Sequence, residues 1–225
     1  MEIFENSSRL VYSSPWMGYP ILEQYAPFYE GYLYRILGVI ESASRHYPKV
    51  FAIRFDLRIP GGFDPSDTAV ISRFMASLNS QIHEDHARHA SKGLYLNGCR
   101  LRYVWAKEIG ERNEGLHYHV CIFLNHKRYS ALGRYVYGNR VDISEAQRNM
   151  AHRICKAWLS ATLGMASPSL VEFCENGVYL LDRGSPEYHK QKSDLFYRLS
   201  YLAKTYTKEN VSGRKFGCSR ETSFS

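Results

Sequence analysis

The segment Gly115-Leu-His-Tyr-His-Val-Cys-Ile-Phe-Leu124 places two histidines one residue apart, directly before an apolar run. Because successive side chains of a β-strand point to opposite faces, His117 and His119 share one face and the apolar residues that alternate with them share the other. Two neutral imidazoles side by side on a rigid strand can bind one divalent ion. The segment predicts a strand with a buried face and a metal site on its other face. The alternative is a pair of half-exposed strand histidines without a ligand.

A hairpin is expected around this strand. Residues 100–109 and 116–125 have strand patterns, and a polar, turn-like segment lies between them. Glu108 lies near the end of the partner strand, so its carboxylate would add a third metal ligand. Three protein ligands leave open positions on the metal, which suits catalysis better than a purely structural role. Glu111 and Glu114 lie nearby and are alternatives for the third ligand.

Residues 50–59 alternate as cleanly as the histidine strand does. Their apolar residues point one way, whereas Arg54, Asp56 and Arg58 point the other, which predicts a half-buried strand with a charged open face. Helices are expected at residues 22–46, 66–89, 142–163 and 192–208, and a further strand at residues 170–181. Asp142 and Glu145 resemble a capping box at the start of the third helix.

This order of helices and strands predicts an α+β fold, in which an antiparallel sheet is covered by helices mainly on one face. Residues 1–47 are expected to form an N-terminal helical extension, and residues 48–225 the main domain.

The composition limits the possible partners and compartments. Lys and Arg number 29 against 22 Asp and Glu, and this excess of positive charge suits a polyanion, although many basic proteins bind none. The five cysteines are widely spaced and odd in number, which predicts reduced thiols in a cytoplasm rather than disulfides or a zinc site. Neither a signal peptide nor an apolar run of membrane-spanning length is found, so we expect a cytoplasmic protein without a membrane partner.

The last expected helix has a polar face that contains tyrosines and lysines. Tyr197, Tyr201, Lys204 and Lys208 follow one another at spacings of four, three and four residues, so they share this face, whereas Tyr206 is expected to face the core. A lysine beside a phenol favours the phenolate and can hold a phosphate, a combination that suits attack on a phosphodiester. Lys204 lies one turn from Tyr201, which makes Tyr201 the expected nucleophile ahead of Tyr197. The alternative is a solvated face of tyrosines and lysines.

A second group of histidines lies at the end of the second expected helix. His83, His86 and His89 recur at every third residue, a spacing that can place two histidines near one metal ion. Their neighbours are charged, which favours a solvated helix end over a metal site.

The ordered set of motifs resembles the HUH endonucleases, which are named for a pair of histidines around a bulky residue. Here the pair is His117-Tyr-His119, the tyrosine motif is Tyr201-Leu-Ala-Lys204, and Phe51-Ala-Ile-Arg-Phe-Asp-Leu57 resembles the first strand motif. More narrowly, Ser200-Tyr-Leu-Ala-Lys204 and Arg214-Lys-Phe-Gly-Cys-Ser-Arg220 are typical of the inovirus replication-initiator-like proteins of filamentous phages and prophages, of the YagK/YfjJ type. The resemblance covers about residues 48–220.

The resemblance implies a fold and an activity. The fold would be a five-stranded antiparallel sheet with the histidines on a central strand. The activity would be nicking and rejoining of single-stranded DNA at a replication origin, with Mg²⁺ or Mn²⁺ on His117, His119 and Glu108 and a 5′-phosphotyrosine on Tyr201. The free 3′-hydroxyl would prime rolling-circle replication in the cytoplasm of a bacterial host. The sequence shows no helicase motif, so a host helicase and polymerase are expected partners.

One departure from the family pattern concerns a second nucleophile. Some phage initiators carry a second tyrosine four residues after the first, where this chain has Thr205. A mechanism with two tyrosines is therefore in doubt, although Tyr197 shares the face of Tyr201.

DNA is expected to contact the open sheet face and the basic groups near the tyrosine helix, namely Arg54, Arg58, Tyr197, Lys208, Arg214 and Lys215. Two other functions stay open. A catalytically silent DNA-binding regulator could use the same fold. A metal-dependent hydrolase that uses water would keep its activity after Tyr201→Phe.

Overall fold

An antiparallel sheet of five strands forms the centre of the computed structural model, which describes residues 9–94, 98–110, 115–133, 149–209 and 211–220. The strands are β3 (Lys49–Arg58), β4 (Arg102–Ile109), β5 (Leu116–Asn125), β6 (Val171–Asp182) and β7 (Phe216–Cys218). Their order in the sheet is β6-β3-β5-β4-β7, so β5, which carries the histidine pair, is the central strand. The α+β class and the five-stranded antiparallel sheet are confirmed, and β4 and β5 form the predicted hairpin.

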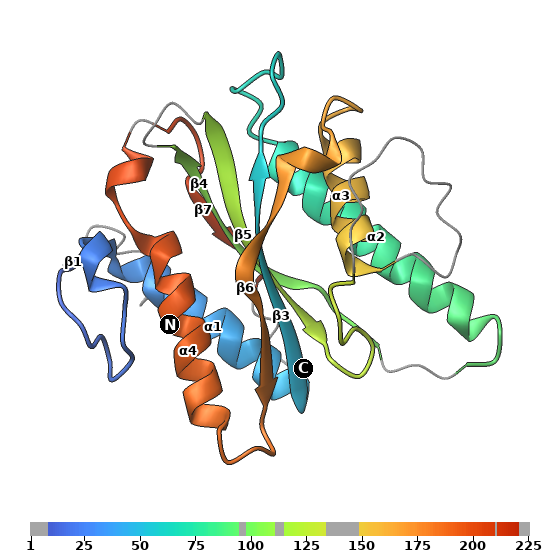
Figure 1. The fold of residues 1–225 in the computed structure, drawn as a ribbon, viewed down its shortest axis with the longest axis horizontal. Coiled ribbons are helices and arrows are strands. Elements are labelled where there is room, and N and C mark those ends of the chain that lie inside the picture. Colours follow the sequence, from blue (N-terminus) through green and yellow to red (C-terminus); the bar gives the residue numbers. More distant parts are fainter. Residues whose placement is uncertain (1–8, 95–97, 111–114, 134–148, 210, 221–225) are drawn as a thin grey trace.

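The helices differ from the expected arrangement because they cover both faces of the sheet. Figure 1 shows α1 (Glu30–His46) and α4 (Tyr188–Ser200) on one side of the sheet and α2 (Val70–Ala90) and α3 (Met150–Ala161) on the other. The reason lies in the face of β3 that was expected to be charged and open, because only half of it is charged. That face begins with the apolar residues Val50 and Ala52 and becomes charged only from Arg54 onward, so its first half needs an apolar cover.

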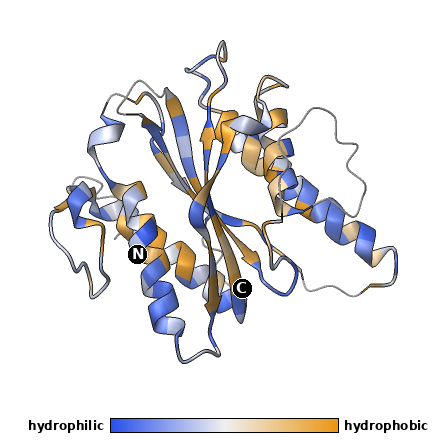
Figure 2. Ribbon diagram, viewed as in Figure 1, coloured by the Kyte–Doolittle hydropathy of each residue, from blue (hydrophilic) through white to orange (hydrophobic). Residues whose placement is uncertain are grey.

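Two hydrophobic cores result, one on each face. Phe55 and Val120 pack with Phe74 of α2 and Trp158 of α3 in the first core. Figure 2 shows orange, hydrophobic stretches along the strands and along the parts of the helices that lie against them. The second core joins Ala52, Cys121 and Phe123 of the sheet to apolar residues of α1 and α4.

The N-terminal segment packs into the second core. Leu33, Ile36 and Ile40 of α1 are all fully buried there. Burying a Leu or Ile side chain contributes roughly 1.5–3 kcal/mol, whereas a whole domain is stable by only about 5–15 kcal/mol. The loss of α1 would therefore cost an amount comparable with the net stability of an ordinary domain.

The helix expected at residues 66–89 begins four residues later, at Val70, and two other expected helices differ more from their expected bounds. Over residues 22–46, a 3₁₀ turn occupies Glu23–Tyr25, Phe28–Tyr29 (β2) pairs with Leu10–Val11 (β1), and the helix begins at Glu30. Pro27 explains the late start, because proline lacks an N–H group and disfavours helical backbone at the residue before it. The expected helix over residues 192–208 begins at Tyr188 and ends at Ser200.

Other expectations concern the cap of α3, the cysteines and membrane-spanning helices. Asn149, and not an acidic residue, caps α3, since its side chain accepts a hydrogen bond from the backbone N–H of His152. The capping box expected at Asp142 and Glu145 lies outside the described residues. All five cysteines are free thiols. In the part of the chain that the structure describes, no helix combines the length and the apolar character needed to cross a membrane.

Gly217 of β7 tests the packing at the edge of the sheet. It lies opposite Trp105 of β4, and a Cβ atom at this position would lie 2.5 Å from the indole ring. Gly217→Ala should therefore lower the free energy of unfolding by about 1–3 kcal/mol, as measured by chemical denaturation. Gly61→Ala is the matched control, because Gly61 has open space around its Cβ position. Equal stability of the two variants would contradict this packing.

Candidate metal centre and tyrosine site

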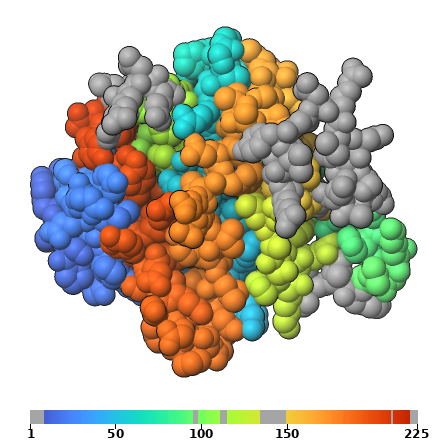
Figure 3. Space-filling model, in the orientation of Figure 1, coloured from blue at the N-terminus to red at the C-terminus, as the bar shows by residue number. Residues whose placement is uncertain are grey.

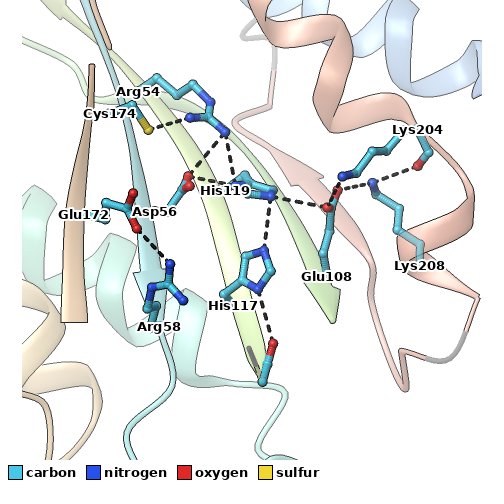
Figure 4. Close-up of polar contacts among 11 residues, drawn as sticks. Arg54, Asp56, Arg58, Glu108, His117, His119, Glu172, Cys174, Lys204 and Lys208 are labelled. Atoms are coloured by element: carbon cyan, nitrogen blue, oxygen red, sulfur yellow. Dashed lines mark hydrogen bonds and ion pairs between the residues drawn. The ribbon is translucent and has the colours of Figure 1, made fainter. Parts of the chain in front are cut away.

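Glu108, His117 and His119 converge at one end of the central hairpin. The strand register places Glu108 directly opposite His117, and alternation along β5 brings His119 to the same face. The two Nε2 atoms are 3.2 Å apart, and His119 Nε2 is 3.3 Å from Glu108 Oε2 (Figure 4). Among the described residues, this is the one group of three metal-binding side chains that converges in this way. The structure thus brings together the three predicted ligands.

The second nitrogen of each histidine ring shows why this group suits a cation. His117 Nδ1 lies 3.2 Å from the backbone oxygen of Gly115, and His119 Nδ1 lies 2.7 Å from Asp56 Oδ1. Both oxygens are acceptors, so both Nδ1 atoms donate, and the Nε2 atoms of the neutral rings keep their lone pairs. Two nitrogen lone pairs that face each other at 3.2 Å repel unless a positive charge lies between them. A metal ion, or a proton on His119, supplies that charge, and the group could therefore bind a metal.

The ionisation of these groups is strongly coupled. Burial opposes the ionisation of Glu108, but the hydrogen bond with His119 and the charge of Lys208 hold the pKa of this carboxyl well below its usual range. Burial likewise opposes the charged form of His119, yet the charge and hydrogen bond of Asp56 raise the imidazole pKa above its usual value. A proton therefore competes with a metal for His119, and metal binding should weaken as the pH falls.

Two lysines contact Glu108, and this contact changes the role expected for one of them. Lys204 Nζ lies 3.0 Å from Glu108 Oε2, and Lys208 Nζ lies 2.6 Å from Glu108 Oε1 (Figure 4). Lys208 is fully buried, and burial lowers its pKa to about 8. Lys208 is therefore a counterion of Glu108 inside the protein and not a surface contact for DNA. The prediction that Lys208 lies on an exposed helix face was wrong because the helix ends at Ser200 and the backbone of Lys204 is not helical, with φ −56° and ψ 150°.

Tyr201 lies beside the Glu108–His117–His119 group, the candidate metal group, in the 3₁₀ turn Tyr201–Ala203 that follows α4. Its ring centroid is 5.2 Å from that of His119, and Lys204 Nζ lies 3.6 Å from the phenol ring centroid. Tyr201, Lys204 and the three predicted ligands all line one cavity of about 510 Å³. Burial, and then the negative charge of Glu108, raise the pKa of the Tyr201 phenol, so the phenol is protonated at rest. Tyr197 is exposed on α4, outside this cavity.

Tyr206 is also placed differently from the prediction. It is 39% exposed instead of facing the core, and its ring centroid is 5.1 Å from Lys204 Nζ. The chain leaves helical geometry before this residue, so the helical periodicity no longer applies to it.

The basic residues expected at DNA divide into buried and surface groups. Arg54 is buried, with its guanidinium 5.9 Å from the centroid of the Tyr201 ring, and it contacts Cys174, His119 and Asp56. The charged face of β3 is therefore covered here, and Arg54 supports the site from inside.

The other predicted DNA contacts lie nearer the surface. Arg58 pairs with Glu172 at 2.9 Å and lines the cavity. Arg214 is exposed, and its guanidinium lies over the ring of Trp105, while Lys215 is half-buried.

Sequence reasoning assigned no role to two residues of the site. Asp56 orients His119, and alternation along β3 could have identified it, because Asp56 shares its face with Arg54 and Arg58. Tyr25 lines the cavity from the N-terminal segment, and no local signal indicates this position.

The second histidine group is a solvated helix end, as predicted. His83 and His86 are exposed, and Figure 2 shows that the end of α2 extending away from the sheet is hydrophilic. His89 Nδ1 contacts the backbone oxygen of Asp85 at 2.7 Å. The three histidines do not converge as metal ligands do.

Mn²⁺ titration by calorimetry tests the metal centre. The double variant His117→Ala, His119→Ala should lose binding, and Asp56→Asn should weaken it by roughly 10–100-fold, because a residue that orients a ligand typically has that effect. The variant His83→Ala, His86→Ala is the matched control and should bind as the wild type does. Unchanged Mn²⁺ affinity in the first double variant, with the fold intact, would rule out this centre.

Comparisons with known proteins identify the relatives of the chain. It is 33% identical to YagK of Escherichia coli strain K12 over 189 residues, which cover 79% of this chain and 86% of YagK. It is also 33% identical to YfjJ of the same strain over 202 residues, which cover 83% of this chain and 92% of YfjJ. Both relatives are described as uncharacterized. No solved structure matches the chain. The YagK/YfjJ C-terminal domain model matches residues 13–219, and the chain therefore belongs to this family.

Proposed function

We propose that this protein is an HUH-type endonuclease that nicks and rejoins single-stranded DNA through a covalent bond to Tyr201. One observation carries the proposal: Tyr201, Lys204 and the Glu108–His117–His119 group line the same cavity. A metal group alone would suit a hydrolase that uses water. A half-buried tyrosine beside that group supplies a protein nucleophile instead.

The proposed step exchanges one phosphate ester for another. The Tyr201 oxygen bonds to the phosphorus and loses its proton, the bond from phosphorus to the 3′ oxygen breaks, and the 3′ oxygen leaves as a hydroxyl. A divalent ion, Mg²⁺ or Mn²⁺, on Glu108, His117 and His119 would polarise the scissile phosphate. Because the 5′-phosphotyrosine ester is retained, the 3′-hydroxyl can attack it and rejoin the strand.

Lys204 can stabilise the charge that develops in this step. Its ammonium lies over the face of the Tyr201 ring, 3.6 Å from the centroid, where a cation is attracted to the aromatic ring. The same charge favours the phenolate and the negatively charged phosphate, and a charge that is already in place needs no rearrangement during the reaction. The ion pair with Glu108 holds Lys204 in this position.

The biological setting proposed for this activity is the initiation of rolling-circle replication of a phage or mobile element in the bacterial cytoplasm. The substrate would be single-stranded DNA at the replication origin, and a host helicase and polymerase would complete replication. A DNA-binding regulator on the same fold would bind this DNA without cutting it.

Incubation with single-stranded origin DNA and Mn²⁺, followed by a denaturing gel, tests the nucleophile. The wild type should form a covalent adduct, Tyr201→Phe should abolish it, and Tyr197→Phe should leave the first cleavage intact because Tyr197 lies outside the cavity. Peptide mapping of the adduct identifies the attached residue. DNA attached at Tyr197 or Tyr206 would overturn the assignment, and cleavage without attached protein would favour the hydrolase that uses water.

The salt dependence of single-stranded DNA binding tests the surface contacts. The logarithm of the association constant should fall linearly with the logarithm of salt concentration, with a slope that decreases by roughly 0.7 for each phosphate contact removed. The variant Arg58→Gln, Arg214→Gln, Lys215→Gln should show the smaller slope. Lys156→Gln, on the exposed face of α3, is the control and should keep the wild-type slope. Binding that does not respond to salt would contradict these contacts.

A further inference from the structure

Residues 22–27 of the N-terminal segment contact both ends of the turn Tyr201–Ala203, which carries the proposed nucleophile. The backbone N–H of Leu22 donates to Ser200 Oγ at 3.0 Å, just before the turn. Just after the turn, the backbone N–H of Thr205 donates to the backbone oxygen of Pro27 at 3.1 Å. Figure 3 shows the blue N-terminal segment lying directly beside the red-orange segment that follows α4. The backbone of the tyrosine turn is therefore fixed by residues about 180 positions away in the chain.

Tyr25 extends this contact into the cavity. Its ring meets the Tyr201 ring edge to face, with the centroids 4.9 Å apart, and Lys204 Nζ lies 5.8 Å from the Tyr25 centroid. The ring of His119 lies 5.2 Å from the Tyr201 ring. The phenol of Tyr201 is thus surrounded by an imidazole, an ammonium group and a second phenol, and this second phenol comes from the N-terminal segment.

Such confinement matters for a nucleophile on an irregular turn. The turn lacks the repeated hydrogen bonds of a helix, and a phenol free of neighbours can occupy several staggered rotamers. Attack on phosphorus requires the reacting atoms to be held about 3–3.5 Å apart, and a misplacement of about 1 Å can slow a reaction by roughly 100-fold. A neighbouring ring that blocks the other rotamers keeps Tyr201 in a single orientation.

We infer that Tyr25 is a positioning residue, which holds Tyr201 and Lys204 over the metal group while the surrounding N-terminal segment anchors their turn. The N-terminal segment is then a part of the tyrosine site and not an appendage to it. The effect on catalysis rests on the proposed function, whereas the effect on the order of the turn does not.

Three variants of the full chain test the catalytic effect. Tyr25→Ala should slow single-turnover formation of the adduct by roughly 10–100-fold at saturating DNA. Tyr25→Phe keeps the ring and should restore a rate near that of the wild type. Tyr12→Ala is the matched control, because Tyr12 is 64% exposed, and it should react as the wild type does. Mn²⁺ affinity should be the same in all three variants, since each keeps the predicted ligands Glu108, His117 and His119.

Amide hydrogen exchange gives a measurement that does not depend on nuclease activity. Tyr25→Ala should speed exchange over residues 200–205 and leave residues 117–123 of β5 as protected as in the wild type, whereas Tyr25→Phe should change neither segment. Wild-type exchange over residues 200–205 in Tyr25→Ala would overturn the inference, as would an undiminished rate of adduct formation. If the wild type forms no adduct, the proposed function fails, and hydrogen exchange alone decides whether Tyr25 positions the turn.

Discussion

The carboxylate of Glu108 is 1% exposed, and three partners compensate its burial: Lys204, Lys208 and His119. A buried charge without such partners would lose several kcal/mol of hydration free energy, and no ion pair or hydrogen bond would compensate the loss. These contacts join β4, the central strand β5 and the segment that follows α4. Residues about 100 positions apart in the chain are thereby fixed around a single carboxylate. The position of the tyrosine depends on this ion cluster as much as on hydrophobic packing.

The charge balance of this cluster favours an anionic ligand. With Asp56 and Arg54, which both contact His119, the cluster has two carboxylates and three cations, the other two cations being Lys204 and Lys208, so with His119 neutral one positive charge remains in excess. A divalent ion would add two more positive charges. A phosphate group that enters the cavity would offset this excess, which supports a phosphodiester as the substrate of the proposed reaction.

The sheet accommodates both the core and the site because one of its faces changes from apolar to polar along the length of the strands. On β5, this face carries Phe123 and Cys121 at one end and His119 and His117 at the other. The antiparallel partner β3 changes one residue pair earlier, because Ala52 lies opposite Phe123 but Arg54 lies opposite Cys121. Helices α1 and α4 cover the apolar half, and the polar half is left to the metal group, the cavity and the tyrosine segment.

The sequence predicts the parts of the site that depend on local patterns, and it misses the parts that depend on contacts between residues far apart in the chain. Alternation along a strand is a local property, so it identified His117 and His119 on β5 and could also have identified Asp56 on β3. Glu108 followed from its place on the partner strand of the hairpin. The end of α4 has no such local signal, because neither Gly nor Pro lies between Ser200 and Lys208. There the hydroxyl of Ser200 donates back to the oxygen of Tyr197 while accepting from Leu22, and Thr205 bonds to Pro27 instead of continuing the helix. Leu22 and Pro27 lie in the N-terminal segment, far away in the chain. Helical periodicity therefore could not reveal that Lys208 is buried or that Tyr25 contacts Tyr201. The candidate metal group is thus encoded by one hairpin, whereas the tyrosine joins it only when the N-terminal segment and the segment after α4 have folded onto the same face of the sheet.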